Sequence, residues 1–444
     1  MSTAVTNAAK LVTVPSSRSA WWTVTALTIL YWFGTLDRQV SALLVPQIKT
    51  DLGLSDFELS LIQGVAFGAA YMLASPLTGW LVDRYSRRKI LFTGVLGWSI
   101  SAVGCGFART FGQLFCGRAG VGAFESTLNP ASYSILSDLF PPGKLALPLS
   151  IYVLGGNLGS GMSFLAGGAV IAWIASASSN SLPVFGQLAD WQVAFIVTGA
   201  PGLLLAPIAL LASDARRDAS GKHSTAGFGD LWRYMRRYPG FFITHNLGFA
   251  CVQALIVGLQ SWNAAYISRT FGWPVSKIGF VLGAAQLIIA LAGLAFHGWV
   301  VDRLFTRGRK DAHLHYFMIM MLLTLPFAVA AYLVPNAIAM IVLYNVAYFF
   351  VMAGASVGPA ALQMATPQDL RGKASSIYMI VLTLIGVVLG PVFVASVTNF
   401  VFQDEALLGY SMASFAFLAC GIAATLFALG RSRMRRIVAE ALQV

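Results

Sequence analysis

Long apolar stretches separated by short polar ones run through most of the 444-residue chain. A stretch of about 20 mostly apolar residues is long enough to cross the hydrocarbon core of a bilayer as a helix. By that criterion the pattern predicts twelve spans in two sets of six. The first set is 21–46, 57–82, 89–108, 111–137, 145–174 and 191–212, and the second is 240–268, 275–301, 314–333, 337–364, 373–400 and 408–430.

The longer polar segments divide the chain at its ends and near its middle. The expected regions are an N-terminal segment 1–20, a six-helix half 21–212, a linker 213–239, a second six-helix half 240–430 and a basic tail 431–444. The linker is too charged to insert into a bilayer. Its second part interleaves aromatic residues with arginines, a pattern typical of a short helix lying on a bilayer surface.

Composition agrees with a membrane protein, because 57% of the residues are hydrophobic and only 10% are charged, against about 25% charged in a soluble domain. The formal net charge of +12 would favour a nucleic-acid partner in a soluble protein. Here 23 of the 29 Lys and Arg residues fall on the side of the linker and both termini. The four on the opposite side are Lys49, Arg109, Arg269 and Lys277, and the two inside spans are Arg38 and Arg118.

This asymmetry predicts the orientation of the chain. Basic residues concentrate on the cytoplasmic side of a membrane protein. We therefore expect both termini and the linker in the cytoplasm, with the chain in the plasma membrane, which in a bacterium is the inner membrane. Topology then accounts for the positive charge, and no nucleic-acid partner is expected.

A charged motif occurs once in each set of six spans. GWLVDRYSRRK covers Gly79–Lys89, and GWVVDRLFTRGRK covers Gly298–Lys310, 219 residues later (298 minus 79). A second related pair is NPASYSILSDLFPPGKLALPLSIYV from Asn129 and GPAALQMATPQDLRGKASSIYMI from Gly358. The chain therefore reads as a duplicated six-helix unit, with any binding site near the midplane between the halves.

The motif at Gly79–Lys89 resembles the loop signature of the major facilitator superfamily, with Ser86 in place of the usual glycine. The resemblance implies an all-α membrane protein with that superfamily's fold, twelve transmembrane helices in two pseudo-symmetric halves. Further strings resemble its spinster branch of lipid transporters, although Phe124 replaces a glycine typical of the branch. They are LDRQ at Leu36–Gln39, DLGLSD at Asp51–Asp56, GRAGVGAFE at Gly117–Glu125 and SDLFPP at Ser137–Pro142.

Charged residues inside the predicted spans mark a candidate site in the first half. Asp37 and Arg38 lie in the first span, and Arg118 and Glu125 in the fourth, where Asn129 continues the same helical stripe. An isolated charge at mid-bilayer costs at least roughly 2.5–3.5 kcal/mol, so such residues face a cavity or a partner. We interpret the five as a proton-coupling site in a central cavity. The alternative is a structural ion pair joining the first and fourth helices.

Proton coupling follows from the chemistry of a carboxyl group whose surroundings alternate between wet and closed, because such a group binds a proton in one state and releases it in the other. The resemblance to the spinster branch implies that Asp37 and Glu125 are the coupling acids.

The second half lacks a counterpart of these charges. Asn246, Gln253 and Gln260 recur at intervals of seven in the seventh span, and Tyr344 and Asn345 lie in the tenth. As a set they predict a neutral, polar and aromatic cavity wall, although interhelical hydrogen bonding explains each residue equally well. A cavity charged on one wall and neutral on the other suits an amphiphile with an anionic head.

The repeated motif ends two predicted spans with an acid and a base. Asp83 and Arg84 close the second span, and Asp302 and Arg303 close the eighth. A carboxylate there attracts the positive end and the free N–H groups of a helix N-terminus. We therefore expect Asp83 to face the start of the eleventh span and Asp302 the start of the fifth, forming a cytoplasmic gate. The superfamily resemblance implies the same lock.

Other features receive structural interpretations. The remaining bases of the first motif, at 87–89, are assigned mostly to topology, and His245 and His297 to packing inside spans. GGNLGSG at Gly155–Gly161 lacks the lysine and the strand of a phosphate loop and predicts close helix packing.

The function predicted from these features is secondary active transport. The sequence contains no Walker loop, no H-E-x-x-H and no G-x-S-x-G string, and its four cysteines lack paired spacing. Neither an enzyme, a cofactor nor a metal site is therefore expected. We predict proton-coupled movement of an amphiphilic lipid, such as a lysolipid or a sphingolipid-type anion, by a monomer using alternating access. The alternatives are a proton-coupled symporter of small organic anions and a drug-type efflux transporter. A receptor of the same fold that no longer transports is disfavoured, because the charged residues Asp37, Arg118 and Glu125 are all present.

Overall fold

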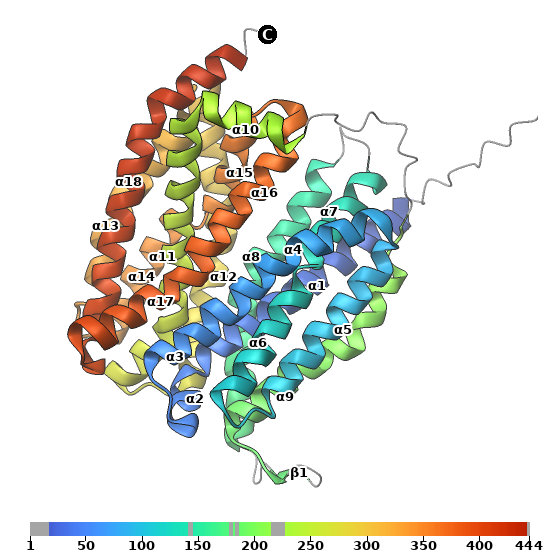
Figure 1. Ribbon diagram of the computed structural model, residues 1–444. Helices are drawn as coiled ribbons and strands as arrows, with labels where there is room; N and C mark the ends of the chain where they lie inside the picture. Colours follow the sequence, from blue (N-terminus) through green and yellow to red (C-terminus); the bar gives the residue numbers. More distant parts are fainter. Residues whose placement is uncertain (1–16, 141–144, 177–180, 183–185, 215–226, 442–444) are drawn as a thin grey trace, which may run out of the picture.

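The structure is a computed structural model that describes residues 17–140, 145–176, 181–182, 186–214 and 227–441 (Figure 1). Nearly all of these residues lie in helices. Among the described residues the strands are β1 (Ser181–Leu182) and β2 (Gly186–Gln187), a short antiparallel pair. The predicted all-α class is therefore confirmed.

The helices of the first half follow the first six predicted spans in order. They are α1 (Ser17–Leu43), α2 (Val45–Leu52), α3 (Asp56–Ser60), the π-helix η1 (Leu61–Ala66), α4 (Phe67–Arg84), α5 (Arg87–Cys105), α6 (Phe111–Glu125), α7 (Leu128–Leu139), α8 (Ala146–Ser176), α9 (Asp190–Leu205) and the 3-10 helix η3 (Ala206–Leu211).

The linker helix α10 and the helices of the second half follow in the same way. They are α10 (Phe228–Arg237), α11 (Pro239–Phe271), α12 (Val275–Thr306), α13 (Ala312–Ala331), α14 (Ala337–Val351), α15 (Gly354–Met364), η4 (Gln368–Leu370), α16 (Arg371–Val381), the π-helix η5 (Leu382–Leu389), α17 (Gly390–Ser396), the π-helix η6 (Val397–Phe402), η7 (Glu405–Leu407) and α18 (Leu408–Ala441).

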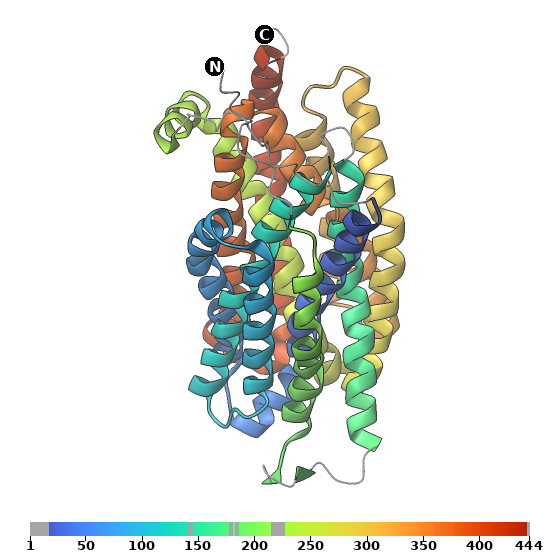
Figure 2. The ribbon, with the colours of Figure 1, turned by 90° about the vertical axis from the view of Figure 1, so that its right-hand side faces the viewer.

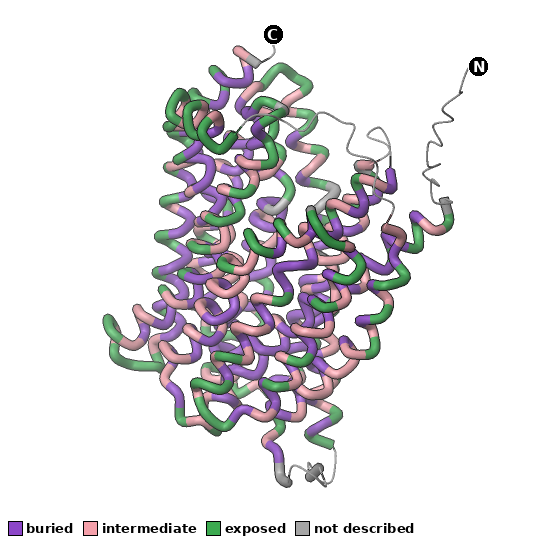
Figure 3. The backbone as a smooth tube through the Cα atoms, turned by 45° about the vertical axis from the view of Figure 1, so that its right-hand side comes forward, coloured by how far each residue is buried: buried purple, intermediate pink, exposed green. Residues whose placement is uncertain are grey.

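The described helices have the character of membrane spans. Nine helical segments of the described chain are long and apolar enough to cross a bilayer, judged by length and composition. The other three predicted spans are also helical, as α1, as α5, and as α6 with α7. Large apolar side chains such as Leu73, Leu204 and Phe400 are exposed, and Figure 3 shows exposed positions along the whole length of the helices. Such a surface suits lipid rather than water.

The helices form two bundles, α1 to α9 and α11 to α18 (Figures 1 and 2). At the end that carries α10 and the C-terminus, hereafter the linker end, the bundles stand apart in Figure 1. At the opposite end, hereafter the far end, α3 contacts α17 and the two bundles meet. Contact between the halves is thus concentrated away from the linker.

Glycines allow the two halves to touch through their backbones. A Cβ atom added to Gly161 of α8 would lie 2.8 Å from the backbone nitrogen of Leu287 in α12, and one added to Gly64 would lie 2.7 Å from the carbonyl oxygen of Val388 in η5. Because glycine has no side chain, the backbones of the two helices can approach each other this closely. The close packing predicted for the glycine-rich segment of α8 is therefore present.

Two spans are interrupted at matching places in the two halves. The fourth span breaks between α6 and α7, after Glu125, and the tenth breaks between α14 and α15, after Val351. At the first break the hydroxyls of Ser126 and Thr127 donate to the carbonyl oxygens of Ala123 and Phe124 at 2.6 and 2.8 Å. These bonds compete with the regular helix ladder and place Glu125 at a helix end.

The last helix continues past the expected membrane boundary. Residues 431–441, predicted as part of a separate basic tail, are the end of α18. Pairing of Arg431 and Arg435 with Asp311 explains the continuation, because it holds this turn against the start of α13.

The contact between α8 and α12 can be tested with a single methyl group. Gly161→Ala introduces a Cβ into the backbone of α12 and should lower the stability of the protein by about 1–3 kcal/mol, the usual cost of overpacking. Gly421→Ala in α18 is the matched control, because no atom lies within 4 Å of its added Cβ. Thermal unfolding of both variants in detergent checks the prediction, and equal midpoints would contradict it.

Candidate functional site

The four charged residues predicted inside the first and fourth spans come together between α1 and α6. Arg118 forms an ion pair with Asp37, in which its Nη1 donates to Oδ2. Arg38 Nη2 lies 3.1 Å from Oε1 of Glu125. The site therefore consists of two neighbouring ion pairs without net charge.

The two pairs differ in their access to solvent. Asp37 and Arg118 are 7% and 2% exposed, and Glu125 is 4% exposed, whereas the side chain of Arg38 is 35% exposed. Within the described chain, Oδ1 of Asp37 and Oε2 of Glu125 have no hydrogen-bond partner. Each acid therefore keeps one oxygen that is free to take a proton, and only the Arg38–Glu125 pair reaches a partly exposed group.

An aromatic ring supports both arginines. The guanidinium carbons of Arg38 and Arg118 lie 5.2 and 5.7 Å from the ring centroid of Phe67, within the range of a cation–π interaction. Phe67 begins α4 directly after the π-helix η1, and the absence of a side chain at Gly122 lets α6 approach the backbone of Phe67. This role could not be predicted from the sequence, because Phe67 is one apolar residue in an apolar run.

Asn129 lies beyond the helix break and belongs to a group of tyrosines beside the charges. Its Oδ1 accepts a hydrogen bond from Tyr152 at 2.7 Å, and its Nδ2 donates to Tyr71 at 3.3 Å. The ring of Tyr152 stacks on that of Tyr31, with centroids 4.9 Å apart. The predicted stripe of α6 thus continues into α7 at Asn129, which binds tyrosines of α4 and α8.

Asn246 takes part in packing within the second half. Its Oδ1 lies 2.9 Å from Nδ1 of His245, whose Nε2 lies 2.9 Å from the carbonyl oxygen of Gly358. His297 similarly contacts the carbonyl oxygen of Phe349 at 2.7 Å. The two histidines therefore join helices, whereas the contact of Asn246 stays within α11.

The other predicted polar residues of the second half are spread over α11 and α14. Gln253 packs against Gly386 of η5, where an added Cβ would lie 2.5 Å from Cγ of Gln253. Asn345 donates to the carbonyl oxygen of Ile341 in its own helix at 2.8 Å. The rings of Tyr344 and Tyr348 stack with centroids 6.1 Å apart, and Gln260 interacts with Tyr348.

The acids predicted to form the gate occupy the linker end, where the bundles stand apart. Asp302 and Arg303 are exposed, and Arg303 lies over the ring of Trp299 at 5.1 Å. Arg84 is exposed in the same way, whereas the side chain of Asp83 and residues 141–144 before α8 lie outside the described part of the structure. The lock therefore remains a prediction for a state in which this end closes.

The interpretation of Arg87 as a topology signal was wrong. Its side chain is buried, and its Nε lies 2.6 Å from Oδ1 of Asp214, beyond the end of η3. Its Nη1 lies 2.6 Å from Oδ2 of Asp138 and 3.0 Å from the carbonyl oxygen of Ser134. Arg87 therefore ties the start of α5 to α7 and to the chain after α9, while the neighbouring Arg88 is exposed.

The second half contains a related ion-pair cluster with the charges reversed. Asp311 precedes α13 and is buried, and its Oδ2 lies 2.9 Å from both Arg431 and Arg435 at the end of α18. Burial alone would raise the pKa of Asp311, but the hydrogen bonds and charges of these arginines outweigh it and hold the pKa below its usual value.

A cluster of four charges closes the far end between the two halves, which we call the far-end cluster. Asp56 of α3 is fully buried, and its two oxygens lie 2.7 Å from Nη1 and Nη2 of Arg269 in α11. Lys49 lies 2.7 Å from Asp56 and also pairs with Glu405 of the second half. The sequence placed both bases on this side but did not predict that they bind a shared acid.

The family of the chain follows from comparison with known proteins. Residues 27–391 match the family model of the Major Facilitator Superfamily. An MFS-type efflux pump of Mycolicibacterium smegmatis is 25% identical over 389 residues, which cover 87% of this chain and 86% of that protein. Protein spinster of Drosophila melanogaster is 29% identical over 254 residues, and human protein spinster homolog 1 is 29% identical over 259 residues. Each of these matches covers 56% of this chain, but only 39% and 46% of the respective spinster proteins.

Solved structures share the fold. A bacterial homolog of the human lysosomal transporter Spinster, in an inward-facing and unoccupied conformation, superposes with a TM-score of 0.78 at 23% identity, covering 97% of this chain and 99% of that one. The same homolog in an occupied conformation gives a TM-score of 0.73 at 24% identity, covering 97% and 96%. The chain belongs to the Major Facilitator Superfamily of membrane transporters and resembles its spinster branch.

Proposed function

We propose that the protein is a proton-coupled transporter that moves an amphiphile with an anionic head by alternating access. The observation that carries this proposal is the double ion pair of Asp37 with Arg118 and Arg38 with Glu125, in which only Arg38 is partly exposed. Protonation of Glu125 removes its charge and leaves Arg38 without a counter-ion. A cation in a low-dielectric site then needs a new anion, and the head of the substrate supplies it.

The difference in exposure assigns a role to each pair. The partly exposed Arg38 and its partner Glu125 exchange protons and substrate, because water and ligand reach them first. Asp37 and Arg118 are closed off, so this pair anchors α1 on α6 and senses the state of its neighbour through the shared ring of Phe67.

The arrangement of the halves corresponds to one state of the transport cycle. The far-end cluster and the glycine contacts between α8 and α12 hold the far end closed, while the two bundles stand apart at the linker end. With the linker and both termini in the cytoplasm of the plasma membrane, as the distribution of basic residues favours, this is the inward-facing state. The opposite state requires the far-end cluster to break and the gate at Asp83 and Asp302 to close.

The substrate class is inferred from the unlike chemistry of the two halves. The first half contributes the charged residues of α1 and α6, and the second half contributes tyrosines and amides of α11 and α14. This contrast favours an anionic amphiphile such as a lysolipid, carried by a monomer. Drug-type efflux is the second candidate, supported by the mycobacterial relative named as an efflux pump, and symport of small organic anions the third.

Coupling can be tested by removing charge from the acids without changing their size. Glu125→Gln and Asp37→Asn should abolish the response of lysolipid transport to a pH gradient in reconstituted vesicles, with the protein still folded. Glu58→Gln is the control, because Glu58 only caps α3 through Ser55. If both variants respond like the wild type, the site does not couple transport to protons.

The far-end cluster should control the closed state of that end. Asp56→Asn removes the anion shared by Arg269 and Lys49, so opening of the far end should become at least about tenfold more populated, equivalent to 1.4 kcal/mol. Glu405→Gln, at the exposed edge of the cluster, should have a smaller effect. Distances between spin labels at the starts of α3 and α18 measure the change; an unaltered distribution in Asp56→Asn would refute this role.

The gate at the linker end should respond in the opposite sense. Asp83→Asn removes the charge that attracts a helix N-terminus, at a cost of roughly 0.3–2 kcal/mol to the closed form. The linker end should then stay open, and transport should slow because one half-cycle stalls. Spin labels on the linker ends of α4 and α16 report the distance. Arg88→Gln should change it less, and an equal change in both variants would leave the motif only a topology signal.

A further inference from the structure

Three of the buried side chains of the second half whose polar atoms lack a hydrogen-bond partner among the described residues lie beside one another. They are Asn263 of α11, Gln286 of α12 and Tyr344 of α14, which are 1%, 2% and 2% exposed. Within the described chain, Nδ2 of Asn263, Nε2 of Gln286 and the hydroxyl of Tyr344 make no hydrogen bond. The two amides lie beside the hydroxyl of Tyr344 and interact with it, although neither contact has the geometry of a regular hydrogen bond. We call these three residues the donor cluster.

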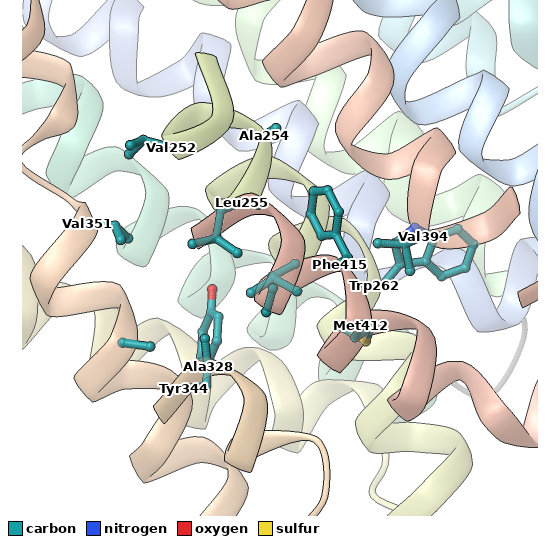
Figure 4. Close-up of a cluster of buried hydrophobic side chains, with 14 of the residues drawn as sticks. Val252, Ala254, Leu255, Trp262, Ala328, Tyr344, Val351, Val394, Met412 and Phe415 are labelled. Carbon is teal, nitrogen blue, oxygen red and sulfur yellow. The ribbon is translucent and has the colours of Figure 1, made fainter. Parts of the chain in front are cut away.

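The donor cluster lies in the largely apolar core of the second half, where Oδ1 of the neighbouring Asn345 also lacks a hydrogen-bond partner in the described structure. Figure 4 shows Tyr344 among side chains of the second-half core that include Leu255 and Ala328. A buried polar group without a partner destabilises a protein, so native structures rarely retain one without a reason. Three together, from three different helices, indicate a site that is completed by a ligand.

The free atoms of the two amides are donors, because their acceptor ends are already engaged. Oδ1 of Asn263 accepts from the hydroxyl of Tyr332 at 2.7 Å. Oε1 of Gln286 accepts from Oγ of Ser160 at 3.4 Å, and Ser160 in turn accepts from Nε2 of Gln39 at 2.8 Å. Each amide is thereby oriented with its NH2 group free. The free amide groups are hydrogen-bond donors, so they suit an oxygen of the ligand and not a cationic head.

The same hydrogen bonds connect the donor cluster to the charged site of the first half. Gln39 follows Arg38 in α1, and the chain Gln39–Ser160–Gln286 runs from α1 through α8 to α12. It crosses between the halves beside the glycine contact of Gly161 with Leu287. One oxygen-rich head group could therefore address Arg38 on one side and the donor cluster on the other.

We propose that Asn263, Gln286 and Tyr344 bind an oxygen of the substrate's polar head and thereby determine which amphiphiles are accepted. This inference rests on the proposed transport function and adds a specificity site in the second half. It requires an acceptor-bearing head, such as a phosphate or carboxylate, and excludes heads that present only a quaternary ammonium. Internal water that fills the cluster without any ligand is the competing explanation.

Binding is measured first, in nanodiscs, as the thermal stabilisation produced by oleoyl lysophosphatidate and by oleyl trimethylammonium. Tyr344→Phe removes only the hydroxyl. Gln286→Glu keeps an acceptor for Ser160 and removes both amide donors. Each variant should need at least fivefold more lysophosphatidate for the same stabilisation, while the response to the ammonium amphiphile stays small and unchanged. Thr425→Ala is the control, because the exposed hydroxyl of Thr425 donates only to the carbonyl oxygen of Gly421 in its own helix.

Transport in reconstituted vesicles separates this inference from the function on which it rests. The KM for lysophosphatidate should rise at least fivefold in Tyr344→Phe, with the maximal rate and the response to a pH gradient unchanged. If the wild type binds lysophosphatidate but does not transport it, the transport proposal fails and the binding site stands. If wild type and both variants bind it equally, or the wild type does not bind it, the cluster holds water only and the inference is overturned.

Discussion

The structure depends on the cost of placing a charge inside a bilayer. Asp37, Arg38, Arg118 and Glu125 are tolerable there only as pairs, so α1 and α6 must keep a fixed register. The helix break after Glu125, the ring of Phe67 beneath both arginines and the missing side chain at Gly122 all serve this register. In the proposed mechanism, protonation of an acid removes the need for its ion pair, and this is how a proton would control the conformation.

The sequence predicted the features that depend on one helix at a time. The length of the apolar runs located the spans, and the free-energy cost of a buried charge identified Asp37 and Glu125 as candidate site residues. The sequence did not predict features that depend on the rotation of one helix against another. Arg87 and Arg88 are chemically identical neighbours, yet only Arg87 turns toward Asp214 and becomes buried.

The same limit applies to contacts across the two halves. Asp56 reads as an ordinary helix-start acid until Arg269, 213 residues later, is brought to it. Gln286 reads as one polar residue in an apolar run, and its free donor becomes visible only when the partner of its carbonyl oxygen is known. The glycine-rich segment of α8 was predictable as a packing surface, but the helix that it contacts was not.

The ion-pair cluster around Arg87 in the first half and the one around Asp311 in the second half have opposite arrangements of charge. This difference has a consequence for how the chain assembles. In the first half a base at the start of α5 requires the acid Asp214, and in the second half the acid Asp311 requires bases at the end of α18. A duplicated protein risks exchanging equivalent helices between its repeats during biosynthesis. If α18 packed where α9 belongs, its arginines would face Arg87. If the chain after α9 packed where α18 belongs, Asp214 would face Asp311. Electrostatic repulsion therefore rejects the exchanged pairings, and each repeat is directed to close on itself.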